Sequence, residues 1–92
     1  MKTFERSDDI NVKELMLAVE KGEGGIIRNA KIQCKQYGSK LRVVYYVPNS
    51  FEYYFVQFPT KLRENGMIYI ADITKQNGFW RAIKGTIIAF SS

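Results

Sequence analysis

The hydrophobic and polar positions follow a helical period only near the start of the chain. One helical stripe is formed by Val12, Leu15, Met16 and Val19. Asn11 can cap the first turn, and Glu14, three residues later, completes a capping-box pattern. Gly22 stands where a helix commonly ends in a left-handed residue. The pattern therefore predicts a helix over residues 11–21, preceded by a flexible arm of mostly polar residues, 1–10.

From residue 26 onward the pattern alternates, which is typical of strands that have one buried and one wet face. The expected strands cover residues 26–36, 40–47, 51–58, 67–75 and 79–90. Turns are indicated at residues 37–39, at Pro48-Asn49 and at Asn77-Gly78, a pair that favours a two-residue hairpin of type I′. Gly85 is expected to form a bulge where the last strand changes phase.

The order of these elements indicates the fold class. A single domain over residues 11–92 is expected, mainly β with an N-terminal helix (α+β). The helix is followed by three strands, about one helical turn at residues 61–64, and two closing strands. This order resembles that of an OB-fold, which implies a small five-stranded barrel. An open five-stranded antiparallel sheet, packed by the first helix, fits the same order and stays as the alternative.

The charges separate the chain into two parts. Residues 1–23 carry four Lys/Arg and six Asp/Glu, a net charge of −2. Residues 24–92 carry ten Lys/Arg and three Asp/Glu, a net charge of +7, together with twelve of the thirteen aromatic residues. Cations neutralise phosphates and release condensed counterions, while ring faces stack on bases. The basic, aromatic-rich part is therefore interpreted as a surface for a nucleic-acid strand.

Two groups of residues are the candidates for such a surface. On the polar side of the first strands we expect Lys31, Lys35, Lys40 and Arg42, with Tyr46 and Tyr54 nearby. The last hairpin contributes Lys75, Trp80, Arg81 and Lys84. The Lys and Arg side chains would neutralise phosphates, and the three aromatic residues would stack on bases.

Each group also has a purely structural interpretation. The first can be a solvated sheet face, whose lysines prevent pairing with other chains. In the second, Phe79 or Trp80 can belong to the core. Adjacent residues of a strand point to opposite faces, so one of these two rings is expected outside it.

Catalytic and metal-binding chemistry has little support in the sequence. The chain has no histidine and one cysteine, Cys34, which excludes a Ser-His or Cys-His nucleophile and a multi-cysteine metal site. We expect no catalytic residue, no metal and no other cofactor. One enzymatic alternative stays open, a metal-independent ribonuclease that uses Arg81, Tyr69, Glu52 or Asp72. A single cysteine and the lack of a membrane-spanning apolar run favour the cytoplasm.

The sequence thus predicts a small cytoplasmic module that binds single-stranded DNA or RNA with low sequence preference. A protein–protein interaction module, of the kind by which phage or mobile-element proteins dock on a host protein, fits the same size and composition. The acidic face of the helix over 11–21 can also compete with nucleic acid for the basic sheet. A dimer through the strand over 79–90 is compatible with the pattern. The choice between DNA and RNA stays open.

Overall fold

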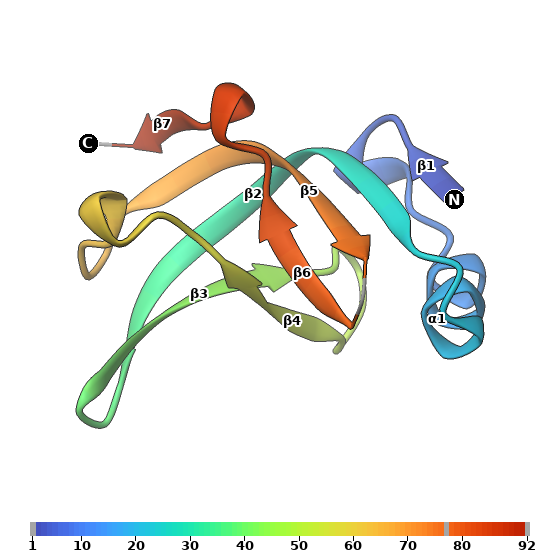
Figure 1. Cartoon of the computed structure of the whole chain (residues 1–92), viewed down its shortest axis with the longest axis horizontal. Coiled ribbons are helices and arrows are strands. Elements are labelled where there is room, and N and C mark those ends of the chain that lie inside the picture. Colours follow the sequence, from blue (N-terminus) through green and yellow to red (C-terminus); the bar gives the residue numbers. More distant parts are fainter. Residues whose placement is uncertain (1, 77, 92) are drawn as a thin grey trace.

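The centre of the molecule is a closed five-stranded barrel. The computed structural model describes residues 2–76 and 78–91. The barrel strands are β2 (Gly25–Tyr37), β3 (Lys40–Tyr46), β4 (Tyr53–Gln57), β5 (Ile68–Gln76) and β6 (Phe79–Ala82). Neighbouring strands pair antiparallel except β4 and β6, which run parallel. Because β2 also pairs with β5, the sheet closes on itself and is an OB-like barrel rather than an open sheet (Figure 1).

The predicted helix is confirmed as α1 (Val12–Lys21). The Asn11 side chain accepts a hydrogen bond from the Glu14 amide, and Gly22 ends the helix with a φ of 70°. Leu15 and Ala18 are buried, and Leu15 belongs to the barrel core. In Figure 1, α1 lies on the side of the N-terminus, away from the β2–β3 hairpin. The helix therefore packs against one end of the core and leaves the hairpin uncovered.

β2 bends at a bulge in its pairing with β5. Its register with β5 shifts between Ile27 and Ala30. Asn29 lies at this bulge with a φ of 55°, and its amide donates to the Asp72 carboxylate at 3.0 Å. A bulge increases the bend and twist of a strand, and a small barrel needs both to close.

The predicted arm is wrong, because the N-terminal residues join the sheet. β1 (Lys2–Phe4) pairs parallel with the start of β2, and a 3-10 turn, η1 (Ser7–Asp9), leads on to α1. Gly25 permits this approach, since a Cβ there would lie 3.3 Å from the carbonyl oxygen of Lys2. The ring of Phe4 is buried in the core. This burial holds the segment against the barrel.

The last predicted strand is wrong in its extent. The segment over 79–90 divides into β6 and β7 (Ile88–Ser91), separated by a 3-10 turn, η3 (Lys84–Thr86). Gly85 lies within this turn rather than at a bulge. The Thr86 hydroxyl accepts from the Asp72 amide at 2.9 Å and donates to the Ile83 carbonyl at 2.7 Å, so the turn is bound to β5. β7 then pairs with the other end of β5.

The two hairpin predictions have different outcomes. β2 and β3 form a hairpin around the predicted turn, with Tyr37 paired to Lys40. β5 and β6 also form a hairpin, with Gln76 paired to Phe79. The type I′ assignment depends on Asn77, which lies outside the described residues.

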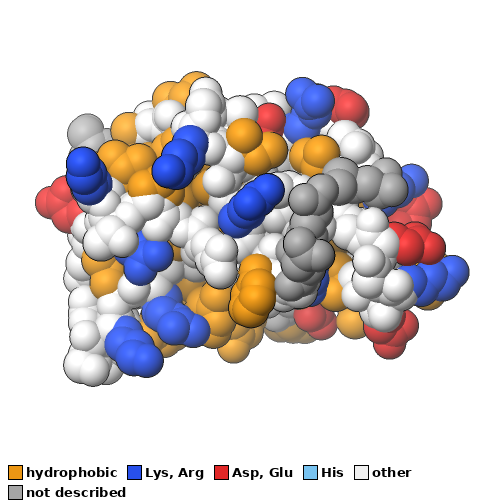
Figure 2. Space-filling view, viewed as in Figure 1, with side chains coloured by type: hydrophobic (Ala, Val, Ile, Leu, Met, Phe, Trp, Pro, Cys, Tyr) orange, Lys and Arg blue, Asp and Glu red, His pale blue; other side chains and the backbone are white. Residues whose placement is uncertain are grey.

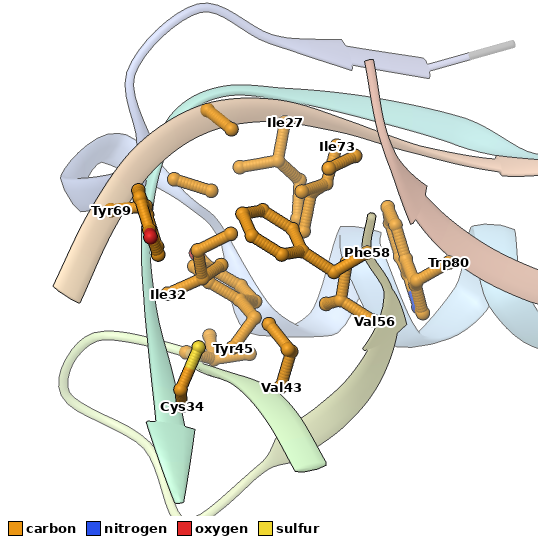
Figure 3. Packing of buried hydrophobic residues seen from close by; sticks show 14 of the residues in the cluster. Ile27, Ile32, Cys34, Val43, Tyr45, Val56, Phe58, Tyr69, Ile73 and Trp80 are labelled. Carbon is orange, nitrogen blue, oxygen red and sulfur yellow. The ribbon is translucent and has the colours of Figure 1, made fainter. Parts of the chain in front are cut away.

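One core fills the barrel. Besides Phe4 and Leu15, its members come from all five barrel strands and from the segments after β3 and β4. Figure 3 labels Ile27, Ile32, Cys34, Val43, Tyr45, Val56, Phe58, Tyr69, Ile73 and Trp80. The segment after β4 contains η2 (Thr60–Leu62), a 3-10 turn close to the turn predicted over 61–64. The Tyr69 hydroxyl donates to the Leu62 carbonyl at 2.7 Å and thereby ties η2 to the core.

Candidate nucleic-acid interface

Six outward-pointing side chains gather where β2, β3 and β4 lie side by side. We call them the aromatic face: Lys35, Tyr37, Arg42, Tyr46, Tyr53 and Phe55. Lys35 lies opposite Arg42, and Tyr46 lies opposite Tyr53, and directly paired residues share one side of a sheet. The four rings are between 37% and 52% exposed, so each presents surface on which a base can stack.

The rings of the aromatic face contact one another. The Tyr53 centroid lies 5.9 Å from that of Phe55 and 6.2 Å from that of Tyr46, and the centroids of Phe55 and Tyr37 are 6.0 Å apart. Tilted and edge-to-face pairs at these distances are mutually stabilising. Val44 points to the same side and is fully buried there. The rings are thus held in position without a ligand, which lowers the entropic cost of binding one.

The two cations of the aromatic face lie over its rings. The guanidinium carbon of Arg42 is 4.3 Å from the Phe55 centroid, and the Lys35 ammonium is 5.1 Å from the Tyr46 centroid. Lys35 also donates a hydrogen bond of 2.9 Å to the Tyr46 hydroxyl. This bond is the main reason that the pKa of Lys35 is raised and the pKa of Tyr46 is lowered. Lys35 is therefore a cation throughout the neutral range.

No described carboxylate forms an ion pair with the aromatic face. The ion pairs among the described residues lie within residues 2–28: Lys2 with Glu14, Arg6 with Asp8 and Asp9, and Arg28 with Glu5. On the side of the molecule shown in Figure 2, carboxylates gather mainly on the right, where Figure 1 places the N-terminal segment, and the Lys and Arg side chains spread across the whole side. The carboxylates of the N-terminal segment thus pair with Lys2, Arg6 and Arg28, and the charge of the aromatic face stays available for an anion.

A hollow of about 490 Å³ adjoins the aromatic face, and we call it the first hollow. The residues that line it belong to β3, to β4, to the β5–β6 hairpin and to the loop after η2. They include Arg42, Phe55, Arg63, Lys75, Phe79 and Trp80. It opens where the β3–β4 pairing stops, beyond Val44 and Phe55. In OB-folds, ligands bind over the second and third strands and beside the flanking hairpin loops. Here β3, β4 and the β5–β6 hairpin hold those places.

A second hollow, of about 250 Å³, lies next to the first, since Gln57 lines both. Arg81 and Lys84 line the second hollow. Gln57 and Arg81 are paired across β4 and β6, and both are exposed. The aromatic face and the two hollows therefore form a continuous outer path over β3, β4 and β6 that carries cations along its length.

Most of the residues predicted from the sequence lie along this path. Lys35, Arg42 and Tyr46 belong to the aromatic face, and Lys40 is exposed beside it at the β2–β3 hairpin. Lys75 and Tyr54 line the first hollow, and Arg81 and Lys84 line the second. Lys31 also points outward, but its ammonium lies over the Phe90 ring of β7, 4.9 Å from the centroid. It is therefore directed away from the path.

Tyr54 and Trp80 do not hold the exposed positions predicted for them. Trp80 is 3% exposed, and Tyr54 is half-buried against it, with ring centroids 5.7 Å apart. Trp80 pairs with Val56, and both point into the core (Figure 3). The exposed ring of the adjacent pair is Phe79. Trp80 is thus excluded as a stacking platform, and Tyr54 offers only the part that lines the first hollow.

The sequence interpretation missed Tyr37, Tyr53 and Phe55 as exposed rings and Arg63 as a nearby cation, and it left open which of Phe79 and Trp80 is exposed. The alternation in residues 51–58 gives no clear signal for Tyr53 and Phe55. Tyr54 alternates in phase with Glu52, Val56 and Phe58, whereas Tyr53 and Phe55 share their phase with Phe51 and Gln57. Each set contains one polar residue, so the pattern does not indicate which set faces outward.

Other chemistry finds little support in the described part of the chain. Within residues 2–76 and 78–91, no group of three or more His, Cys, Asp or Glu side chains is placed to hold a metal ion. The described residues also contain no helix that is both long and apolar enough to cross a membrane. Of the ribonuclease candidates, Tyr69 is buried and its hydroxyl is bound to the Leu62 carbonyl, which removes it from contact with a substrate.

The strand topology defines the class of this protein as a small OB-like barrel with an N-terminal helix. Comparison with protein families, with curated proteins and with solved structures finds no match to this chain. The aromatic face and the two adjoining hollows are the features of this barrel that bear on its function.

Proposed function

We propose that the protein binds single-stranded DNA or RNA across the aromatic face, with low sequence preference. The observation that carries the proposal is the set of four exposed, mutually packed rings with two cations that have no ion-pair partner among the described residues. Every base has a ring face, so stacking on Tyr37, Tyr46, Tyr53 and Phe55 tolerates any sequence. Lys35 and Arg42 meet the backbone phosphates between the stacked bases.

The continuous outer path indicates the course of the bound strand over the surface of the protein. From the aromatic face the backbone passes along Gln57 toward Arg81 and Lys84, which line the second hollow. Bases of a duplex are already stacked and paired, and their ring faces are not accessible to these side chains. The protein is therefore expected to prefer single strands over duplexes of the same sequence.

An equilibrium titration over a range of salt concentrations tests this proposal. For single strands the logarithm of the binding constant falls with the logarithm of salt at a slope of about −0.7 per phosphate contact. Contacts by Lys35, Lys40, Arg42 and Arg81 predict a slope of about −3. The double variant Lys35→Gln/Arg42→Gln is expected to flatten this slope to about −1.5. Fluorescence anisotropy with a labelled oligonucleotide of about 12 nucleotides measures it.

The matched control removes the same charge from another surface. Lys13→Gln/Lys21→Gln takes two exposed cations from α1, which lies outside the path. This variant is expected to keep the slope of the unaltered protein within about 0.5. Equal flattening by both double variants indicates a net-charge effect without a defined site, and lack of binding at low salt refutes the proposal.

A protein-docking role is the second candidate, and the surface around β7 favours it. Ile88 is 65% exposed and Phe90 is 57% exposed on this edge strand, which pairs only with β5 among the described residues. Exposed apolar groups beside an unpaired strand edge favour association with another chain. Recovery of one protein partner after nuclease treatment, together with loss of that partner in Ile88→Ser/Phe90→Ser, would support this role. The buried thiol of Cys34 is compatible with the cytoplasmic location that we propose for either role.

A further inference from the structure

The first hollow carries more positive charge than a single backbone phosphate can match. Arg42, Arg63 and Lys75 all line it, and its lining contains no Asp or Glu. None of the three cations belongs to the ion pairs of the described chain, which lie within residues 2–28. Three cations around one recess favour a ligand group with more than one negative charge.

Arg63 is fixed in place before a ligand binds. Its Nε and Nη2 atoms donate to the Phe58 carbonyl at 3.1 and 2.8 Å. Since a guanidinium has five donors in a rigid plane, two bonds to one carbonyl leave others for a second acceptor. A pre-positioned guanidinium loses less side-chain entropy on binding than a free one.

The rest of the lining suits a nucleotide unit. Phe55 and Phe79 contribute exposed rings, and Phe79 is 64% exposed. The indole of Trp80 also lines the first hollow. The volume of about 490 Å³ lies within the usual range of small-ligand pockets, roughly 300–1,000 Å³.

We propose that the first hollow binds the terminal phosphate of a nucleic-acid strand whose following bases lie on the aromatic face. A phosphodiester inside a strand carries one negative charge, whereas a phosphate monoester carries about 1.5 to 2 at pH 7. The three cations match the monoester. Arg42 and Phe55 belong to both surfaces, so a bound end continues onto the rings. This inference rests on the proposed function and adds recognition of the strand end to it.

The test compares three oligonucleotides of one sequence: with a 5′-phosphate, with a 3′-phosphate, and with hydroxyl groups at both ends. Unlabelled competitors in an anisotropy assay avoid a dye at either end. One phosphorylated form is expected to bind at least five-fold tighter than the hydroxyl form, and the preferred end gives the polarity of the strand. The preference should shrink at pH 5, because the second ionisation of a phosphate monoester lies near pH 6.

Two variants separate loss of the phosphate site from loss of folding. Arg63→Gln and Lys75→Gln each remove one lining cation, and only Arg63 also holds the Phe58 carbonyl. In both, the affinity ratio between the phosphorylated and hydroxyl forms is expected to fall to within two-fold of one. Lys61→Gln, an exposed cation of η2 outside the lining, should keep the full ratio.

The outcomes separate this inference from the proposed function. Equal affinity of the three oligonucleotides, with clear binding of all, overturns the end-phosphate site and leaves strand binding in place. A preference that survives both Arg63→Gln and Lys75→Gln also overturns it. If none of the three binds at low salt, strand binding itself is refuted.

Discussion

Replacing Tyr53 and Phe55 together by alanine is expected to weaken binding of a single-stranded oligonucleotide about 30-fold or more. Base–ring stacking is worth about 1–3 kcal/mol per base, and 1.4 kcal/mol is a factor of ten in affinity. The centroids of the two rings are 5.9 Å apart at the centre of the aromatic face, and the guanidinium of Arg42 lies over the Phe55 ring. Anisotropy titrations at one fixed salt concentration measure the change.

A matched variant separates stacking from a general loss of exposed apolar surface. Met16→Ala/Leu17→Ala removes two exposed apolar side chains from α1, where alanine also favours the helix. We expect it to change affinity by less than two-fold. Urea unfolding of both variants confirms that each is folded under the binding conditions. If the Tyr53/Phe55 variant binds within three-fold of the unaltered protein, the rings are not the stacking platform.

Trp80→Ala is expected to have the largest effect on stability, about 3–5 kcal/mol in the free energy of unfolding. The indole is 3% exposed, and its ring packs against Tyr54 and near Gly25 at the start of β2. A domain of this size has a total stability of about 5–15 kcal/mol, so a large part of it would be lost. Urea unfolding followed by far-ultraviolet circular dichroism measures the loss.

The neighbouring residue is the control, because it points to the other side of the same strand. Phe79 is 64% exposed, so Phe79→Ala is expected to change the unfolding free energy by only about 0.5 kcal/mol. Similar losses in the two variants would show that the assignment of inside and outside on β6 is incorrect.

The sequence pattern correctly predicted those helices and strands that depend on interactions between residues close together in the sequence. The cap at Asn11, the apolar stripe and Gly22 define α1, and all three act within a few residues of the helix ends. Alternation defines β2 and β3 because apolar and polar residues alternate over residues 30–35 and 40–43. The order of helix and strands then indicated the OB-like arrangement that the structure shows.

Features that depend on distant partners could not be predicted from alternation. β1 forms because β2 offers it a free edge and Gly25 leaves room for its backbone. β7 is a separate strand because Thr86 binds both β5 and the Ile83 carbonyl. The bulge at Asn29 depends on its bond to Asp72, more than forty residues away. Each contact joins segments far apart in the sequence, where a periodic pattern holds no information.

In the candidate site, too, features that follow from a local pattern were predicted, and features that depend on distant contacts were not. The outward direction of the β2 and β3 cations was predicted correctly because each of them is next to an inward-pointing apolar residue. β4 is apolar on both sides, so Tyr54 was assigned to the wrong one. Trp80 was misplaced because its direction follows from the parallel pairing with Val56, which closes the barrel. The first hollow also draws on four separate segments, and only the folded chain brings them together.

The central claim is that a single strand lies across the outer side of β3, β4 and the start of β6. Amide chemical shifts of isotope-labelled protein, recorded while an unlabelled single-stranded oligonucleotide is added, test it most directly. We expect the largest changes in residues 35–46, 53–57 and 78–81, and little change in α1 (Val12–Lys21). Changes concentrated in α1 or β7, or no changes with the oligonucleotide in excess at low salt, would contradict it.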